Sequence, residues 1–304
     1  MSLSRRDLLR LSGLGLGATA FPVLGQVTKS MPKRKLGKMG WEASIYAVGT
    51  AEIPGDEEAI IALNQLLEGG VNYIDTAPSY MGTRSEKAIG IVMKKRRKEV
   101  FLATKTLERS ADGAYAEVKA SLERLQTDHV NLLQVHAVND TGTLDQILAK
   151  GGAIEGLERA KKDGLIRHIG ITGHTRPEVI LEAPKKYPFN SFLVPVSALD
   201  KHIHDWADEV LPAANKLGIS IVGMKSLKGI ERATGGKFEA EPLLRYSLSL
   251  PISTLTIGLR RGMEVGKNLD AVRAFKKMSS DEMAKLEADM KQHANVETLW
   301  WKRR

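Results

Sequence analysis

Short apolar runs alternate with amphipathic stretches along most of the chain. The apolar runs are five to eight residues long and rich in β-branched residues, which predicts buried strands. Eight such runs lie at residues 44–50, 71–76, 100–105, 129–136, 167–172, 191–197, 219–225 and 253–257. Between them, apolar residues recur every three or four positions, which predicts helices. The predicted helices span residues 56–67, 114–125, 154–162, 206–217, 242–250 and 280–293.

The regular alternation of strand and helix predicts a parallel sheet in an α/β protein. Two architectures satisfy it, an open doubly wound sheet and a closed (β/α)₈ TIM barrel. Eight units within roughly 250 residues favour the barrel. Residues 33–41 predict an additional β-hairpin before the first unit. No linker or change in composition follows residue 30, so we predict a single barrel domain over residues 31–304.

The composition describes an ordinary globular protein and narrows its chemistry. Hydrophobic residues make up 42% of the 304 residues and charged residues 27%, values typical of a soluble domain. The chain has no cysteine, which excludes disulfides, thiolate catalysis and cysteine-ligated metals. His202 and His204 have a spacing that suits a metal, but no third ligand accompanies them. We therefore predict no metal site.

The net charge of +9 raises the question of a nucleic-acid partner. Basic runs lie at residues 94–98 and 302–304. The first run continues an amphipathic stretch and reads as the solvated end of a helix. Because no nucleic-acid recognition motif accompanies either run, we expect no nucleic-acid binding.

The first 25 residues have the layout of an export signal. They read MSLSRRDLLRLSGLGLGATAFPVLG, a charged start followed by a weakly apolar, glycine-rich stretch and small residues. The segment from Ser4 to Arg10 resembles the twin-arginine motif, which predicts recognition by the Tat machinery and a periplasmic or otherwise exported protein. The apolar stretch is too short for a stable membrane span. Cleavage after Ala20 or near Gly25 and an uncleaved anchor remain alternatives.

Four polar residues stand where predicted strands end. Asp75 and Tyr80 follow the second strand, Lys105 ends the third and His136 ends the fourth. In a barrel of this kind, the chemistry takes place at the carboxyl ends of the strands, so these side chains are expected to converge. Each follows an apolar run and is expected to be partly buried, so the charges of Asp75 and Lys105 would have to form an ion pair.

These residue types suit the reduction of a carbonyl. Hydride arriving at the carbonyl carbon leaves negative charge on oxygen, which a proton donor must neutralise. Tyr80 is the candidate donor, and a nearby Lys105 is expected to lower its pKa, with Asp75 anchoring the lysine. A neutral His136 can orient the carbonyl oxygen. Singly, each residue also has a structural reading, as a turn cap, a surface ion pair or a core histidine. Their matched placement favours catalysis.

Residues 70–80, with the sequence GVNYIDTAPSY, resemble the first signature of the aldo-keto reductases. Further matches lie at 84–86 (RSE), 103–105 (ATK), 121–125 (SLERL), 132–136 (LLQVH), 164–170 (GLIRHIG) and 268–269 (NL). The resemblance runs from about residue 33 to about residue 275. It implies an NAD(P)H-dependent reductase that uses NADP, with NAD possible, and a barrel that binds the cofactor without a Rossmann fingerprint. It also assigns the catalytic roles to Asp75, Tyr80, Lys105 and His136.

The residues that would bind the cofactor depart from the family pattern. The resemblance places them at Thr172, Gly173, Met224, Lys225, Gly258, Arg260, Arg261 and Asn268. Gly173 stands where relatives usually have an asparagine that holds the nicotinamide amide. Leu193 replaces a glutamine, and Met224 replaces an aromatic that stacks on the nicotinamide. A branch of the family with a Gly-Met-Lys segment resembles this chain in these changes, so they are compatible with activity.

The loop after the last strand bears on the choice between NADP and NAD. Arg260 or Arg261 would pair with a 2′-phosphate, which favours NADP. Solvated loop charges are the competing interpretation. Glu264 falls near the position of a phosphate-binding arginine in many relatives and weakens the case for strict NADP use.

Three functions follow from the sequence. The first is an oxidoreductase that interconverts a small-molecule carbonyl and its alcohol. The second is a cofactor-binding or sensing module on the same barrel without net turnover, and the third is an epimerase with a retained cofactor. The predicted loops at residues 51–56, 138–143 and 228–238 would select the substrate, but no sequence pattern in them identifies it.

Overall fold

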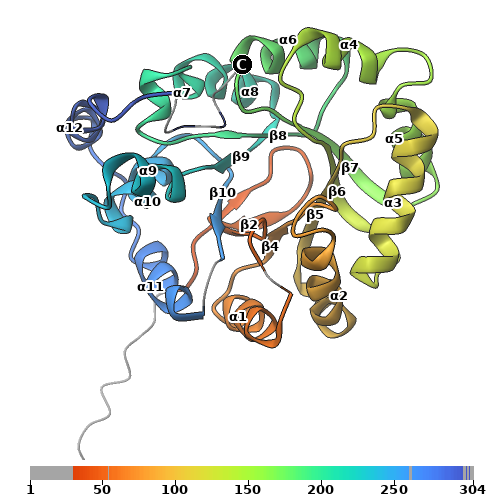
Figure 1. The fold of residues 1–304 in the computed structure, drawn as a ribbon, viewed down its shortest axis with the longest axis horizontal. Helices are drawn as coiled ribbons and strands as arrows, with labels where there is room; N and C mark the ends of the chain where they lie inside the picture. The colour runs from red at the N-terminus through yellow and green to blue at the C-terminus, as the bar shows by residue number, and fades with distance from the viewer. Residues whose placement is uncertain (1–29, 54, 260–261, 297–298, 300, 302–304) are drawn as a thin grey trace, which may run out of the picture.

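Eight parallel strands form a closed barrel in a computed structural model that describes residues 30–53, 55–259, 262–296, 299 and 301 (Figure 1). Neighbouring strands follow the order β10-β3-β4-β5-β6-β7-β8-β9. The strands are β3 (Tyr46–Gly49), β4 (Tyr73–Asp75), β5 (Phe101–Thr106), β6 (Val130–Val135), β7 (Ile166–Thr172), β8 (Ser191–Pro195), β9 (Ser220–Met224) and β10 (Thr254–Gly258). Each lies within or beside one of the predicted apolar runs, so the (β/α)₈ barrel is confirmed.

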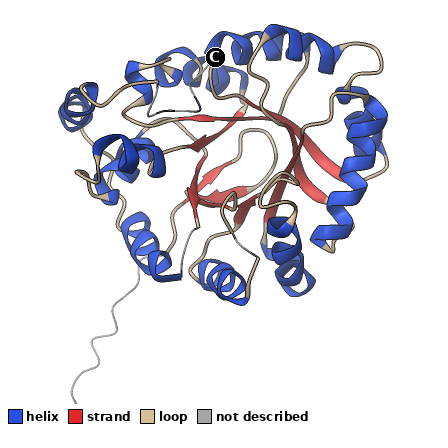
Figure 2. Ribbon diagram, in the orientation of Figure 1, coloured by secondary structure: helices blue, strands red, loops and turns tan. Residues whose placement is uncertain are grey.

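Helices surround the barrel on its outside (Figure 2). They are α1 (Glu57–Glu68), α2 (Arg84–Arg96), α3 (Ala111–Leu125), α4 (Thr141–Leu148), α5 (Ala153–Lys162), α6 (Pro177–Lys186), α7 (Trp206–Glu209), α8 (Leu211–Leu217), α9 (Lys228–Thr234), α10 (Ala240–Ser249), α11 (Gly262–Arg273) and α12 (Ser280–Lys291), with 3₁₀ turns η2 (Arg97–Glu99) and η3 (Asp200–His202). Within the part of the chain that the structure describes, none is long and apolar enough to cross a membrane.

Two differences from the predicted helices have clear causes. The predicted helix at 206–217 is divided into α7 and α8, and Pro212 lies in the first turn of α8, where its missing N–H costs no helical hydrogen bond. The stretch 228–238, expected to be a loop, begins with α9, which ends at Gly235 in the left-handed conformation (φ 63°). The predicted signal at residues 1–25 lies outside the described residues.

The predicted N-terminal hairpin is present and closes one end of the barrel. Its strands β1 (Lys33–Lys35) and β2 (Glu42–Ser44) pair antiparallel. Trp41 packs against Phe101 with ring centroids 5.9 Å apart, and Phe101 stacks on Tyr73 at 5.0 Å. Because Tyr73 and Phe101 are the first residues of β4 and β5, this cluster fills the amino-terminal end. The carboxyl end is the one left for chemistry.

The register of the barrel brings polar side chains together at the carboxyl end. Asp75 lies opposite Ala103, and Lys105 lies opposite Gln134 on the next strand. Alternate residues of a strand face the same side, so Lys105 and Gln134 share the interior with the carboxylate of Asp75. All three residues are buried.

Candidate active site

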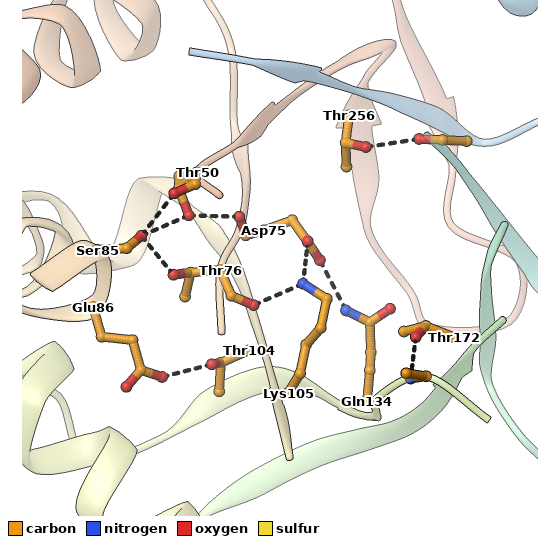
Figure 3. Close-up of polar contacts among 12 residues, drawn as sticks. Thr50, Asp75, Thr76, Ser85, Glu86, Thr104, Lys105, Gln134, Thr172 and Thr256 are labelled. Atoms are coloured by element: carbon orange, nitrogen blue, oxygen red, sulfur yellow. Dashed lines mark hydrogen bonds and ion pairs between the residues drawn. The ribbon is translucent and has the colours of Figure 1, made fainter. Parts of the chain in front are cut away.

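A buried ion pair forms the centre of the site. The Lys105 ammonium donates to Asp75 Oδ1 and, over 2.7 Å, to the carbonyl oxygen of Thr76. Gln134 Nε2 donates to the second carboxylate oxygen, Asp75 Oδ2, over 2.8 Å (Figure 3). The side chain of Lys105 is 0% exposed and that of Asp75 4%. The carboxylate is thus shared between a cation and an amide, as a buried charge requires.

A chain of hydroxyl groups fixes the backbone on both sides of Asp75. Thr50 Oγ1 donates to the carbonyl oxygen of Asp75 over 2.9 Å. Ser85 Oγ donates to Thr50 Oγ1 and lies 2.9 Å from Thr76 Oγ1 (Figure 3). The three hydroxyl residues are fully buried. They anchor the start of the loop that leads from β4 to Tyr80.

The family-like segments at 84–86 and 121–125 support the site from outside the barrel. Glu86 is 0% exposed and accepts from Thr104 Oγ1 over 2.6 Å and from Arg124 Nε over 2.5 Å. Thr104 directly precedes Lys105 on β5. The pair between Glu86 and Arg124 therefore ties α2 and α3 to the strand that carries the lysine.

Tyr80 lies beside the lysine, as the sequence predicts. Lys105 Nζ is 4.7 Å from the centre of the Tyr80 ring. Burial raises the pKa of Tyr80, and the nearby Lys105 lowers it by less, so the net pKa is raised. The expected lowering by Lys105 is present, but burial outweighs it, and the sequence does not show how strong that desolvation is. Tyr80 is a neutral phenol at physiological pH.

The pKa of Lys105 itself is raised. Burial lowers this pKa, while Asp75 and Tyr80 together raise it by more. The ammonium form is thus held next to the phenol over the whole physiological pH range.

His136 completes the group of four predicted residues. Its ring meets that of Tyr80 edge-on, with centroids 6.0 Å apart and planes at 84°. Burial, and then the neighbouring Lys105, His174, Arg109 and Lys225, lower the pKa of His136 to about 2. The imidazole is therefore neutral, as expected.

A cavity of about 540 Å³ opens at the carboxyl end of the barrel, within the range of small-molecule sites. It crosses the seam between the first and last barrel strands, since Gly258 of β10 pairs with Gly49 of β3, and Gly49 pairs with Asp75. Its lining includes Thr50, Asp75, Tyr80, Leu193, Met224, Lys225, Thr256, Gly258, Lys267 and Asn268.

The cavity contains half of the eight residues predicted to bind a cofactor. They are Met224, Lys225, Gly258 and Asn268. Arg260 and Arg261 lie outside the described residues. The apolar side chains of Leu193 and Met224 lie in the same cavity as Tyr80, and the buried amide of Asn268 and the cation of Lys267 also line it. An apolar wall with a few polar groups fits a nicotinamide dinucleotide.

Thr172 and Gly173 are not among the residues that line this cavity. Thr172 Oγ1 instead accepts from Ala137 N over 2.8 Å. A Cβ built on Gly173 would lie 2.8 Å from a side-chain carbon of Ile180 and 3.3 Å from the carbonyl oxygen of Val138. Both residues thus shape the loop that follows His136, and close packing explains why a glycine stands here in place of a larger residue.

The backbone is left-handed next to three of the site residues. Met81, Ala137 and Lys225 have φ values of 50°, 56° and 68°, a conformation that strains a non-glycine residue. Each directly follows a residue of the site, namely Tyr80, His136 and Met224. The chain turns sharply after placing each of these side chains.

Sequence reasoning overlooks Gln134, although the signal is present. Gln134 precedes His136 by two positions, and a strand period of two puts both on the same side of the sheet. For the pair His202 and His204, the structure gives another partner, since His202 Nε2 lies 2.7 Å from the carbonyl oxygen of Glu287. Among the described residues, no group of three potential ligands is arranged to hold a metal ion.

The sequence profile described as "Aldo/keto reductase family" matches residues 46–280. The chain belongs to this family. An uncharacterized oxidoreductase of Bacillus subtilis, YqkF, is 28% identical over 86% of this chain and 97% of its own length. L-galactose dehydrogenase of Arabidopsis thaliana is 26% identical over 88% and 96%. The holo form of aldo-keto reductase AKR11C1 from Bacillus halodurans has a TM-score of 0.72 and 26% identity, covering 88% of this chain and 97% of that one.

Family membership settles the class of reaction. The protein is an NAD(P)H-dependent oxidoreductase that acts on carbonyl compounds and the corresponding alcohols. This aldo-keto reductase has the four predicted residues together at the carboxyl end of its barrel, next to a cavity suited to the cofactor.

Proposed function

We propose that this aldo-keto reductase reduces its carbonyl substrate with Tyr80 as the proton donor, supported by Asp75, Lys105 and His136. The observation that carries the proposal is the position of Tyr80, which lines the cavity, has the Lys105 ammonium 4.7 Å from its ring centre and meets the ring of neutral His136 edge-on. A bound nicotinamide dinucleotide would supply the hydride.

The four side chains divide the proton chemistry between them. As the carbonyl carbon accepts hydride, its oxygen gains negative charge and takes the phenolic proton of Tyr80, which yields the alcohol. Lys105 stabilises the phenolate that remains, because an ammonium favours the charged form of a neighbouring phenol. Asp75 keeps Lys105 protonated. Neutral His136 donates a hydrogen bond that orients the carbonyl oxygen.

Substitution of Tyr80 by phenylalanine tests this assignment. We expect Tyr80→Phe to lower kcat for aldehyde reduction by about 10²–10⁴-fold, while the Kd of the cofactor, measured by fluorescence titration, stays within about twofold. Tyr115→Phe is the matched control, because that hydroxyl bonds Asp163 on the protein surface. Full turnover by Tyr80→Phe would show that another group donates the proton.

For the cofactor, we propose NADP, with NAD as the alternative. Gly258 and Lys267 line the cavity, and Arg260 and Arg261 follow Gly258 in the sequence. Cations at this place would pair with a 2′-phosphate. The test is the ratio of KM for NADPH and NADH in the wild type and in the double variant Arg260→Ala/Arg261→Ala. We expect the substitutions to raise KM for NADPH at least tenfold and to leave KM for NADH almost unchanged. An equal effect on both would refute the assignment.

For location, we propose export to the periplasm through the Tat machinery, with no stable membrane insertion after cleavage. The support is the sequence pattern from Ser4 to Arg10. Fractionation of expressing cells tests it. We expect Arg5→Lys/Arg6→Lys to retain the full-length chain in the cytoplasm, while the wild type reaches the periplasm in shortened form. Wild-type chain found full-length in the cytosol would contradict the proposal.

A further inference from the structure

Side chains from both neighbouring strands hold the peptide bond that follows His136. Arg109, in the loop after β5, donates from Nη2 to the carbonyl oxygen of His136 over 2.7 Å. Thr172, the last residue of β7, accepts through Oγ1 from the backbone N of Ala137 over 2.8 Å (Figure 3). Because β5 and β7 are the two neighbours of β6 in the barrel (Figure 1), this peptide is fixed from both sides. We call Arg109 and Thr172 the peptide clamp.

The peptide clamp acts where the regular sheet ends. The backbone N of His136 still donates to the carbonyl oxygen of Thr106 over 2.9 Å, as in a parallel ladder. The next residue, Ala137, is left-handed with φ 56°, a conformation that strains a residue with a Cβ and persists only where the surroundings hold it. Val138 N donates to the carbonyl oxygen of Thr172 over 2.8 Å. The chain is thus bonded at each step of the sharp turn after His136.

Within the described part of the chain, no hydrogen bond fixes the direction of the His136 imidazole. A functional histidine is commonly oriented by a hydrogen bond at the ring nitrogen that does not meet the reacting group. The Nδ1 atom of His136 is buried and has no such partner among the described residues. The contacts of the ring with Tyr80 and His174, at centroid distances of 6.0 and 6.5 Å, are packing contacts. The direction of the ring therefore depends on its backbone, which the peptide clamp holds.

Among the described residues, the bond to His136 is the single hydrogen bond of the Arg109 guanidinium. Its Nη1 is buried without a partner there, an arrangement that costs free energy. Burial lowers the pKa of Arg109, and Asp140 and Glu108 partly offset that effect, but arginine stays protonated in proteins. A charged donor forms a stronger hydrogen bond to a carbonyl oxygen than a neutral donor does. A strong bond to His136 thus accounts for the costly burial of Arg109.

We propose that Arg109 and Thr172 are positioning residues of the reaction: by fixing the peptide after His136, they direct its imidazole towards the carbonyl oxygen of the substrate. The inference rests on the proposed function, in which neutral His136 donates a hydrogen bond to that oxygen. The peptide clamp takes the place of a hydrogen bond at Nδ1. It also gives Thr172 a role towards His136, whereas the family resemblance implies a role towards the cofactor.

A misdirected imidazole should reduce turnover more than binding. A displacement of about 1 Å at a reacting group can reduce the rate by about 10²-fold. Neither Arg109 nor Thr172 is among the residues that line the cavity proposed for the cofactor. Variants of the peptide clamp should therefore lower kcat for aldehyde reduction, while the Kd of the cofactor, measured by fluorescence titration, stays within about twofold of the wild type.

Two substitutions of Thr172 separate its hydroxyl from the rest of the side chain. Thr172→Val keeps the shape and removes the acceptor for Ala137 N, whereas Thr172→Ser keeps the oxygen. We expect Thr172→Val to lower kcat at least about tenfold, and Thr172→Ser to stay within about threefold of the wild type. Wild-type kcat in Thr172→Val, or a loss that consists only of weaker cofactor binding, would overturn the role of Thr172.

Arg273 offers a matched control for Arg109. Its Nη2 also donates to a backbone carbonyl oxygen over 2.8 Å, that of Gly69 at the end of α1, and its Nε is buried without a partner among the described residues. We expect Arg109→Met to lower kcat at least about tenfold and Arg109→Lys, which keeps a cation, to recover part of the loss. Arg273→Met should leave kcat unchanged. Near-UV circular dichroism verifies that the variants are folded, and an equal loss of kcat in Arg109→Met and Arg273→Met would overturn the role of Arg109.

A double-mutant cycle shows whether the peptide clamp acts through His136. His136→Ala has no imidazole to direct, so adding Arg109→Met or Thr172→Val to it should change kcat by less than about twofold. If either substitution lowers kcat as much in His136→Ala as in the wild type, that residue acts independently of His136 and the proposal is wrong.

Nuclear magnetic resonance tests the peptide clamp without turnover and so separates it from the proposed function. The chain has seven histidines, and His136→Ala identifies the signals of His136 in long-range ¹H–¹⁵N spectra of histidine-labelled protein. We expect one neutral tautomer in the wild type at pH 7, and signals shifted or broadened by ring motion in Arg109→Met/Thr172→Val. Unchanged signals refute the peptide clamp, even if aldehydes are reduced well. Shifted signals support it even if His136→Ala retains full turnover, a result that refutes the role of His136 in the proposed function.

Discussion

The ion pair between Asp75 and Lys105 makes a sharp prediction about stability. Asp75→Asn preserves the shape of the side chain and removes its charge. Oε1 of Gln134 has no hydrogen-bond partner among the described residues, so that amide can turn to accept from the new Nδ2 group, and packing is preserved. What remains is an ammonium that is 0% exposed and has lost its counter-charge.

The expected loss in the free energy of unfolding is about 3–5 kcal/mol, the typical effect of leaving one partner of a buried pair alone. No discount for solvent screening applies, because both side chains are buried. For a chain of this size, this corresponds to a fall in Tm of roughly 6–10 °C. Urea unfolding at pH 7, followed by tryptophan fluorescence, measures it.

The pH dependence distinguishes charge from packing. In the wild type the folded pKa of Lys105 is raised, so its contribution is fully present up to the unfolded value of about 10.4 and is lost only above it. In Asp75→Asn burial remains without the counter-charge, and the folded pKa falls below that value. The stability of the variant should then rise with pH up to about 10.4, whereas this contribution in the wild type stays constant.

A double variant tests whether the uncompensated charge of Lys105 causes the loss of stability. Asp75→Asn/Lys105→Met removes the stranded charge, so it should be more stable than Asp75→Asn alone by about 2 kcal/mol or more. The reasoning is refuted if Asp75→Asn loses less than about 1 kcal/mol, if its stability falls between pH 7 and 9.5, or if the double variant is no more stable than the single one.

Three further predictions follow from the site and its surroundings. Because the pKa of His136 is lowered to about 2 while the unfolded chain binds a proton below about 6.5, His136→Asn should lose less stability than the wild type between pH 6.5 and 4.5 in urea titrations. Gly229→Ala, whose Cβ would overlap Trp301, should cost about 1–3 kcal/mol by urea unfolding, whereas Gly266→Ala, with open space in α11, should be neutral or stabilising by up to about 1 kcal/mol. Ala137→Gly should raise stability by up to about 1 kcal/mol, because it relieves a left-handed alanine, and an unchanged or lower Tm in calorimetry would show that the turn is not strained.

Periodicity predicts the architecture because a barrel repeats one simple pattern. Every strand is an apolar run that must be buried on both faces. Polar catalytic side chains can therefore occur only where such a run ends, at the carboxyl end of the barrel. That logic locates Asp75, Lys105 and His136 from the sequence. It also places Tyr80 near them, because the loop after β4 is short.

The features that the sequence does not predict depend on how deeply a side chain is buried and on contacts between residues far apart in the chain. The sign of the net pKa shift of Tyr80 needs the balance of burial against the field of Lys105, and only coordinates supply it. Gln134 reads as an ordinary strand residue until the register pairs it with Lys105. The short helix α9 is not predicted because it contains Gly229 and three charged residues and is followed by two glycines; its packing against Trp301 joins residues far apart in the chain.

The cavity that crosses the seam between β10 and β3 has a consequence for the lifetime of the folded protein. These two strands are the last and the first of the barrel, and their pairing joins segments more than 200 residues apart. For the chain to unfold, β10 must separate from β3. A ligand that contacts both strands would hold them together and so oppose unfolding. Its concentration relative to its Kd would then set the added stability. The loaded enzyme should survive proteases and heat far longer than the empty one.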